Sequence, residues 1–233
     1  MISTMRNNVL NFVELLNKTG IYQTFIYASS SSVYGDTKEL VVDETHTHFE
    51  PNNFYDLSKY EIDSYASLAN KKCFGLRFGT VNGSSPNLRN DIMINAMTYN
   101  AKRNNKVFCF NPKIYRPILG MKDLCSAIEV ILEEGTYENS GIYNVASFNS
   151  TAEEIAEKVS NILNVELEVT DSLPKEVTNM KLQTKAYNFR IDSEKFKNEF
   201  NFEFKETVES IVNSLIDNFH EIKKGNRSYA KLY

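Results

Sequence analysis

The chain has 233 residues, of which 42% are hydrophobic and 24% are charged, and its formal net charge is -4 at pH 7. This composition is that of an ordinary globular protein with one substantial core, which excludes a disordered chain or a membrane protein. The acidic balance gives no basic field for nucleic acid, and residues 1–6 do not begin a signal peptide. Three cysteines without metal-ligand spacing, Cys73, Cys109 and Cys125, indicate reduced thiols in a cytoplasmic protein.

The first element that we expect is an amphipathic helix at about residues 4–17. Val9, Phe12, Val13 and Leu16 fall at i, i+3, i+4 and i+7, and Gly20 follows as a C-cap.

A strand follows at Phe25–Ala28, where the run is apolar and aromatic. Four serines, Ser29 to Ser32, come directly after it, so they lie at the carboxyl end of a strand. Ligands bind at that end of the strands in open α/β sheets.

A second helix is predicted from about Tyr55 to Ala69. Tyr55 and Lys59 are four residues apart and therefore share one helix face. A free phenol has a pKa near 10, and lowering it by about three units requires roughly 4 kcal/mol, which a nearby ammonium and an oxidised nicotinamide can supply. Taken alone, such a pair is more often a half-buried ring beside a solvated charge.

The rest of the chain continues the alternation of strands and helices. We expect strands at 73–78, 107–110 and 142–145, a loop at 82–87 and a helix at 91–103. A further helix starts at Asp123 and turns four apolar residues inward, Leu124, Ile128, Ile131 and Leu132. A capping box at 150–153 precedes a helix that carries Ile155, Val159 and Ile162, and the last helix carries Val208, Ile211, Val212, Leu215 and Phe219. No metal site is expected, because His46 and His48 lack further ligands.

In order along the chain, these pieces resemble the extended short-chain dehydrogenase/reductase family, specifically its NAD-dependent epimerases and dehydratases that act on nucleotide-diphosphate sugars. The matching segments are Asn8-Val9, Phe25 to Gly35, Tyr55 to Lys59, Leu76 to Val81, Arg89 to Asn95, Arg116 to Asp123 and Gly141 to Val145. The resemblance implies an α/β fold, with a partial doubly wound (Rossmann-type) parallel sheet and a small C-terminal α/β substrate lobe. It divides the chain into a Rossmann-type portion at 1–148 with a substrate-lobe insertion at about 82–118, a main substrate lobe at 149–220 and a polar tail at 221–233.

The resemblance also assigns the site. Ser30, five residues before Gly35, matches the catalytic hydroxyl, with Tyr55 as acid/base and Lys59 as the residue that lowers its pKa. The cofactor, NAD or NADP, is expected at Ser29, Tyr55, Lys59, Phe78, Thr80 and Val81. The sugar nucleotide is expected at Ser30, Ser31, Asn95 and Arg116.

The chain departs from the family pattern in three places. Ser31 and Ser32 stand where the 4,6-dehydratases have an Asp-Glu pair, which argues against dehydration, because loss of water needs a further acid and base. Gly120-Met121 stands where His-Val is common. Tyr187 falls where a second phosphate-binding arginine is expected, a role for which Lys185 or Arg190 is a candidate.

The family's opening strand, GxxGxxG turn and helix have no counterpart here, since the nine glycines include no such cluster. We therefore expect a truncated or split enzyme that lacks roughly 90 residues, because each βαβ unit takes about 30. The resulting hypothesis is an NAD(P)-dependent nucleotide-sugar epimerase or 4-keto-sugar reductase, a homodimer through its first two helices, with a separate N-terminal fragment as a possible partner. The alternative is a non-catalytic remnant or partner subunit that retains sugar-nucleotide binding or dimerisation.

Overall fold

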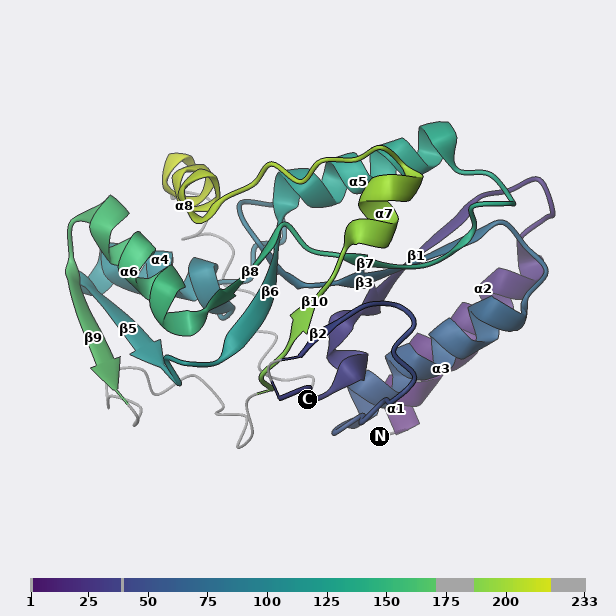
Figure 1. The fold of residues 1–233 in the computed structure, drawn as a ribbon, viewed down its shortest axis with the longest axis horizontal. Helices are drawn as coiled ribbons and strands as arrows, with labels where there is room; N and C mark the ends of the chain where they lie inside the picture. The colour runs from purple at the N-terminus through teal and green to yellow at the C-terminus, as the bar shows by residue number, and fades with distance from the viewer. Residues whose placement is uncertain (1, 39, 171–186, 219–233) are drawn as a thin grey trace.

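The computed structural model describes residues 2–38, 40–170 and 187–218 of the chain. Its centre is a parallel sheet of three strands in the order β1-β3-β7, formed by Phe25–Ser30, Cys73–Phe78 and Gly141–Val145 (Figure 1). Ser30 pairs with Phe78, and Phe78 pairs with Val145, so the three strands end level with one another. The predicted strand at residues 73–78 is confirmed, and the first strand extends two residues further than expected, into the serines.

Helices cover both faces of this sheet (Figure 1). One face carries α1 (Ile2–Met5), a π-helical turn at Arg6–Leu10, α2 (Asn11–Lys18) and α3 (Phe54–Leu68). The other face carries α5 (Met121–Glu134) and α7 (Glu194–Glu199). Each interface has its own apolar core, and the result is the three-layered, Rossmann-type α/β fold that the sequence predicts.

The second lobe lies beyond the ends of the strands. Its elements are α4 (Met93–Asn104), β5 (Lys106–Phe110), α6 (Ala152–Leu163), β9 (Glu166–Thr170) and α8 (Val208–Asp217), and they share a separate core. Two small sheets join it to the first lobe. One consists of β4 (Thr80–Asn82), β6 (Tyr115–Gly120) and β8 (Phe148–Thr151). The other consists of β2 (Val41–Val42) and β10 (Arg190–Ile191). Helix α7 packs on the first lobe although it follows α6 in the chain, and the domain boundaries themselves stay a prediction.

Three details differ from the sequence-based expectations. The first helix is capped at Thr19, whose extended backbone ends it, so Gly20 is not its C-cap. Leu132 is 63% exposed, because α5 turns it away from the sheet. The capping box of α6 joins Thr151 and Glu154, one residue later than predicted. The expected position of Phe219 and the polar tail lie outside the described residues.

A buried ion pair links the sheet to α3. Arg77, on the middle strand, donates to Asp63 of α3 at 2.8 Å and to the Tyr34 hydroxyl at 2.8 Å. Tyr27 donates to the same Asp63 carboxylate at 3.0 Å, and its ring lies where a side chain at Gly75 would be. Glycine at position 75 therefore allows this close approach of Tyr27 to the neighbouring strand.

None of the helices in the described ranges is both long and apolar enough to cross a membrane.

Candidate active site

The serine run turns sharply where β1 ends. Ser30 is the last residue of the strand, and Ser31–Tyr34 form one turn of 3-10 helix. The Ser30 Oγ lies 2.8 Å from the Ser32 Oγ and accepts a longer hydrogen bond, 3.3 Å, from the Ser32 backbone N–H. Ser30 is half-buried, so its hydroxyl remains within reach of a ligand.

The two neighbouring serines face inward instead. The Ser31 Oγ donates to the Phe78 carbonyl at 2.7 Å, and only 3% of the residue is exposed. Ser29 is 2% exposed, and its Oγ has no hydrogen-bond partner within the described residues. The role of Ser31 in substrate binding stays a prediction, but its proton is already used within the protein.

Helix α3 presents Tyr55 and Lys59 to the same strand end. The helix begins at Phe54 because the Asn53 side chain accepts from the Asp56 backbone N–H at 2.9 Å and so caps the first turn. The Lys59 Nζ donates to the Ala28 carbonyl at 2.6 Å and lies 5.6 Å from the centroid of the Tyr55 ring. The structure thus brings the predicted pair beside the strand that carries Ser30.

The electrostatics of Lys59 have two opposing parts. Burial lowers its pKa, and the nearby Asp63 carboxylate acts in the opposite direction. A protonated lysine beside the ring of Tyr55 favours the phenolate, which is the form that a general base needs.

A buried carboxylate, which the sequence-based prediction missed, lies next to Tyr55. Asp56 is 1% exposed and accepts from the Ser32 Oγ at 2.6 Å, from the Tyr187 hydroxyl at 2.6 Å and from the Asn53 Nδ2 at 2.7 Å. The available signal was the spacing of Asn53 and Asp56, a cap residue and an acidic residue three positions later.

Asn95 and Arg116, both expected at the sugar nucleotide, lie in different settings. The Asn95 amide is buried, accepts from the Gly83 N–H at 2.9 Å and donates to the Arg89 carbonyl at 2.8 Å, so it holds the loop between them. The Arg116 guanidinium lies 5.7 Å from the Phe189 ring centroid, and burial lowers its pKa to about 10. Their contacts with substrate stay predictions.

The remaining expected residues lie along β3 and β4. Phe78 ends β3 and supplies the carbonyl that Ser31 uses, while Thr80 and Val81 pair with β6. Of the two candidates for the missing arginine, Arg190 stacks on Tyr115 at 4.5 Å from the ring centroid, and Lys185 lies outside the described residues.

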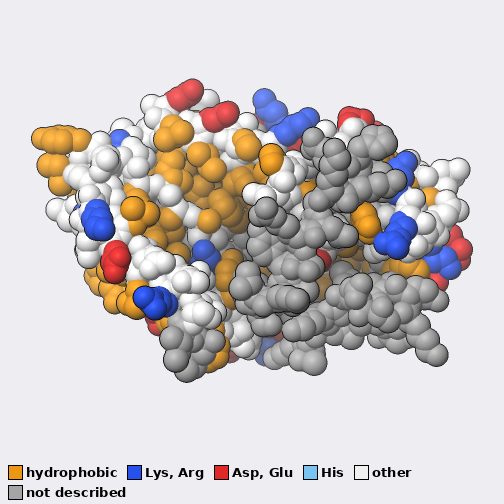
Figure 2. All heavy atoms as spheres, turned by 180° about the vertical axis from the view of Figure 1, so that it is seen from behind, with side chains coloured by type: hydrophobic (Ala, Val, Ile, Leu, Met, Phe, Trp, Pro, Cys, Tyr) orange, Lys and Arg blue, Asp and Glu red, His pale blue; other side chains and the backbone are white. Residues whose placement is uncertain are grey.

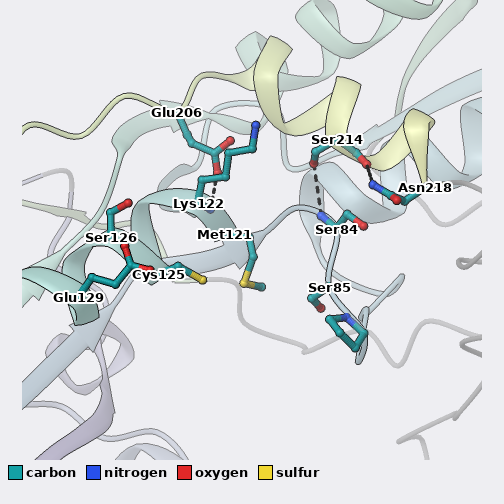
Figure 3. A pocket seen from close by; sticks show the side chains of 11 residues that line it. Ser84, Ser85, Met121, Lys122, Cys125, Ser126, Glu129, Glu206, Ser214 and Asn218 are labelled. Atoms are coloured by element: carbon teal, nitrogen blue, oxygen red, sulfur yellow. Dashed lines mark hydrogen bonds between the residues drawn. The ribbon is translucent and has the colours of Figure 1, made fainter. Parts of the chain in front are cut away.

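Figure 3 shows a separate recess of about 590 Å³, whose lining does not include Ser30, Tyr55 or Lys59. It is bounded by the loop at Ser84–Pro86, the start of α5 and the face of α8 that carries Ser214. Within it the Glu206 carboxylate accepts from the Lys122 backbone N–H at 2.9 Å. Because that contact satisfies the first turn of α5, the acidic residue there has a structural role.

The residues present fit one end of a dinucleotide. The Ser29 hydroxyl has no hydrogen-bond partner within the described residues, and Tyr55 and Lys59 are further polar groups that could meet a nicotinamide and its ribose at the strand ends. For the pyrophosphate the usual support is a glycine-rich turn opening a helix, and the nine glycines of the chain have no GxxGxxG spacing.

Residues 2–146 match the NAD dependent epimerase/dehydratase family. Among solved structures, a dTDP-glucose 4,6-dehydratase from Bacillus anthracis in complex with NAD has a TM-score of 0.78 and 24% identity, with 95% of this chain and 71% of that chain covered. A UDP-glucuronic acid 4-epimerase from Bacillus cereus, in complex with UDP-glucuronic acid and NAD, has a TM-score of 0.75 and 17% identity, with 94% and 68% covered. RMD from Pseudomonas aeruginosa, complexed with NADPH, has a TM-score of 0.73 and 20% identity, with 94% and 74% covered.

Proposed function

The chain belongs to the NAD dependent epimerase/dehydratase family, and from that membership we propose that it serves as an NAD(P)-dependent nucleotide-sugar epimerase or 4-keto-sugar reductase. The observation that carries the proposal is the hydrogen bond from Lys59 to Ala28, because it fixes the Tyr55-bearing face of α3 against the strand that ends in Ser30. Three groups suited to proton transfer at a carbinol oxygen thereby share one end of the sheet.

In this proposal each residue has one task. Tyr55 removes a proton from the sugar hydroxyl or returns it to the carbonyl oxygen. Lys59 favours the phenolate of Tyr55 through its positive charge, and Ser30 orients the reacting oxygen. NAD or NADP, when bound, would supply the hydride acceptor or donor, and Ser29, Tyr55 and Lys59 are the residues that would hold its nicotinamide end.

Epimerisation or reduction is favoured over dehydration. Removal of water from the sugar needs an acid and a base in addition to the tyrosine. Ser31 and Ser32 supply no carboxyl group, and Asp56, the carboxylate that accepts from Ser32, is 1% exposed with three side-chain donors already bound to it.

Two further roles complete the proposal. Exposed apolar residues on α2 and α3, including Leu15 and Leu68, support a homodimer through these helices. The absence of a GxxGxxG turn from the sequence supports the alternative of a partner subunit that binds a nucleotide-diphosphate sugar without turnover, or that works with a separate N-terminal fragment.

One experiment separates the enzyme from the binding subunit. The chain is supplied with NAD or NADP and with UDP-sugars, and both the formation of reduced cofactor and the interconversion of the sugars are followed. Turnover that disappears in Tyr55→Phe supports the enzyme, whereas sugar-nucleotide binding without turnover supports the partner subunit. Failure of the chain to bind any nucleotide sugar contradicts both.

A further inference from the structure

The first turn of α3 carries Tyr55 at the surface of the molecule. Asn53 and Phe54 are exposed, and Asp56 is the first residue of the helix that is buried, with 1% of it accessible. Two hydrogen bonds close the turn, from the Asp56 N–H to the Asn53 side chain at 2.9 Å and from the Leu57 N–H to the Asn53 carbonyl at 3.1 Å. The first N–H groups of a helix lack partners within it, so such a turn depends on side chains that hold it. The position of Tyr55 therefore depends on the contacts of Asp56.

Three side chains donate to the Asp56 carboxyl group. Asn53 belongs to the same turn and donates at 2.7 Å, and Ser32 donates at 2.6 Å from the end of β1. Tyr187 donates at 2.6 Å from a segment 131 positions further along the chain. A carboxyl group can accept hydrogen bonds with or without its proton, so the contact with Tyr187 does not require a particular ionisation state of Asp56.

Tyr187 is itself fixed in place. It is 7% exposed and belongs to a buried apolar cluster with Val33 and Phe189, and its ring centroid lies 6.4 Å from that of Phe189. The next residue, Asn188, accepts from the Tyr115 backbone N–H at 2.9 Å. The Tyr187 hydroxyl is therefore a donor with a fixed position, to which the first turn of α3 is attached.

Position 187 is also where the family pattern has a second phosphate-binding arginine. A tyrosine has no positive charge to place beside a phosphate, and the Tyr187 hydroxyl already donates to Asp56. Arg116, the other position of that pattern, keeps its guanidinium, which lies 5.7 Å from the Phe189 ring centroid. The two positions therefore have different tasks in this chain.

We propose that Tyr187 is a positioning residue, which anchors the first turn of α3 through Asp56 and so places Tyr55 for proton transfer, and that it does not bind the diphosphate of the substrate. This inference rests on the proposed function, because it takes Tyr55 as the acid/base. It leaves the charge of Arg116, and not position 187, to meet the diphosphate.

Hydrogen exchange of the ligand-free chain tests the anchor. The amides of Asp56 and Leu57 exchange when the first turn opens, since both donate to Asn53. In Tyr187→Phe, which removes only the hydroxyl, they should exchange about tenfold faster, the equivalent of one hydrogen bond of about 1.4 kcal/mol. Amides in the last two turns of α3 should stay within about twofold of the wild type.

Tyr22→Phe is the matched control, because it removes the same hydroxyl from a residue that is 92% exposed. It should leave the exchange of Asp56 and Leu57 unchanged. Unchanged rates at these two amides in Tyr187→Phe, or an equal acceleration along the whole of α3, would overturn the anchor.

Calorimetry with UDP tests the second half of the proposal. UDP carries the diphosphate without a sugar, so its binding does not depend on Tyr55. Tyr187→Phe should bind UDP within about twofold of the wild type, whereas Arg116→Met should bind it about tenfold more weakly, because a charge-assisted hydrogen bond is lost. Equal losses in the two variants would show that position 187 contacts the diphosphate and would overturn this part.

Turnover separates positioning from a general loss of folded protein. In Tyr187→Phe kcat should fall about tenfold and KM should stay within about twofold. The pH profile of kcat should also move to higher pH, by up to about one unit, because a displaced Tyr55 is stabilised less by the charge of Lys59. A profile that decreases in height without moving would overturn the positioning role. If the wild type neither turns over nor binds UDP, the proposed function fails, while the exchange of Asp56 and Leu57 still decides the anchor.

Discussion

The ammonium of Lys59 donates a hydrogen bond of 2.6 Å to the backbone carbonyl of Ala28, two residues before Ser30 on the same strand. The lysine therefore has a structural partner as well as its place 5.6 Å from the Tyr55 ring. Its charge is held beside the proposed acid/base by a backbone atom, which does not titrate.

Tyr55→Phe should abolish turnover and leave sugar-nucleotide binding within about twofold of the wild type. The substitution removes only the hydroxyl that transfers the proton, a contribution of about 10² to 10⁴ in rate. Rates are measured with NAD or NADP present, and binding is measured by calorimetry on the same preparations. Activity of the variant within a few-fold of the parent would contradict the assignment of Tyr55.

Arg77→Met should lower the free energy of unfolding by about 3 to 5 kcal/mol, because it leaves the buried Asp63 carboxylate without its charged partner. Lys197→Met, which breaks an exposed pair with Glu194, should cost no more than about 1 kcal/mol. Urea unfolding of the two variants gives the comparison. Equal losses in the free energy of unfolding would show that burial does not make the pair of Arg77 and Asp63 more stabilising than the exposed pair.

The stability of the protein should fall as the pH rises above about 10. Burial and the Asp56 hydrogen bond raise the pKa of Tyr187 to about 12, and burial raises that of Tyr143 to about 12. The unfolded chain, whose tyrosines titrate near pKa 10, loses these protons first. The stabilisation is therefore complete below about pH 10 and is lost towards pH 12.

Tyr187→Phe should flatten this decline, and Tyr22→Phe should not, since Tyr22 is 92% exposed. The measurement is the unfolding midpoint in urea at a series of pH values. Identical slopes for both variants and the parent would contradict the assignment to Tyr187.

The apolar residues whose spacing predicts the first helix are not the ones that we expect at the dimer interface. Phe12 packs on Phe25 and Tyr27, with ring centroids 5.5 and 5.0 Å away, and Leu16 is buried in the same core, so neither is available to a partner. Leu15 and Leu68 are 58% and 87% exposed on α2 and α3.

Leu15→Glu should therefore give a monomer in sedimentation experiments at tens of micromolar, where the parent should be a dimer. Leu132→Glu, at an exposed position of α5 on the opposite face of the sheet, is the control and should remain dimeric. A monomeric parent would contradict the proposed interface.

The 233-residue chain by itself should bind NAD only weakly, on the order of millimolar, because contacts at the nicotinamide end make up a small part of a dinucleotide's surface. Its stability should also be modest. Within the described residues β1 pairs with β3 alone, and apolar side chains gather on the face seen in Figure 2. Calorimetry showing micromolar binding would mean that another element supports the pyrophosphate.

A polypeptide carrying the strands that precede this segment in the family should raise both properties together. Such a partner would pair with the open edge of β1 and provide the glycine-rich turn, and binding would then be linked to folding. The readouts are the thermal midpoint and the NAD affinity of the mixture. A rise in neither would contradict the complementation.

The regular part of the fold could be predicted from local patterns. Cys73–Phe78 is a short apolar run, and the strand has these bounds in the structure. The spacing of Tyr55 and Lys59 likewise predicts their shared helix face, and α3 includes both. These local patterns predict the structure correctly because they depend only on residues that are close in the sequence.

The setting of Asp56 could not be predicted in this way. Tyr187 reaches it across 131 positions of the chain, and only the tertiary fold brings the two together. The same applies to Ser31, whose hydroxyl donates to a carbonyl 47 positions away and is buried, whereas Ser30 stays half-buried. Sequence spacing identifies the residue types of the site, while the tertiary fold decides which of their polar atoms remain free.

The contacts of Arg77 also bear on how the molecule assembles. Its partners Asp63 and Tyr34 belong to α3 and to the turn at residues 31–34, and Tyr34 in turn donates to Asn144, 110 positions away, at 2.9 Å. A partly folded chain with β1 and β3 paired but the 31–34 turn unformed would enclose a guanidinium without its partners, at high cost. The turn, the sheet and α3 should therefore open and close as one cooperative unit in hydrogen exchange, distinct from the second lobe with its own core.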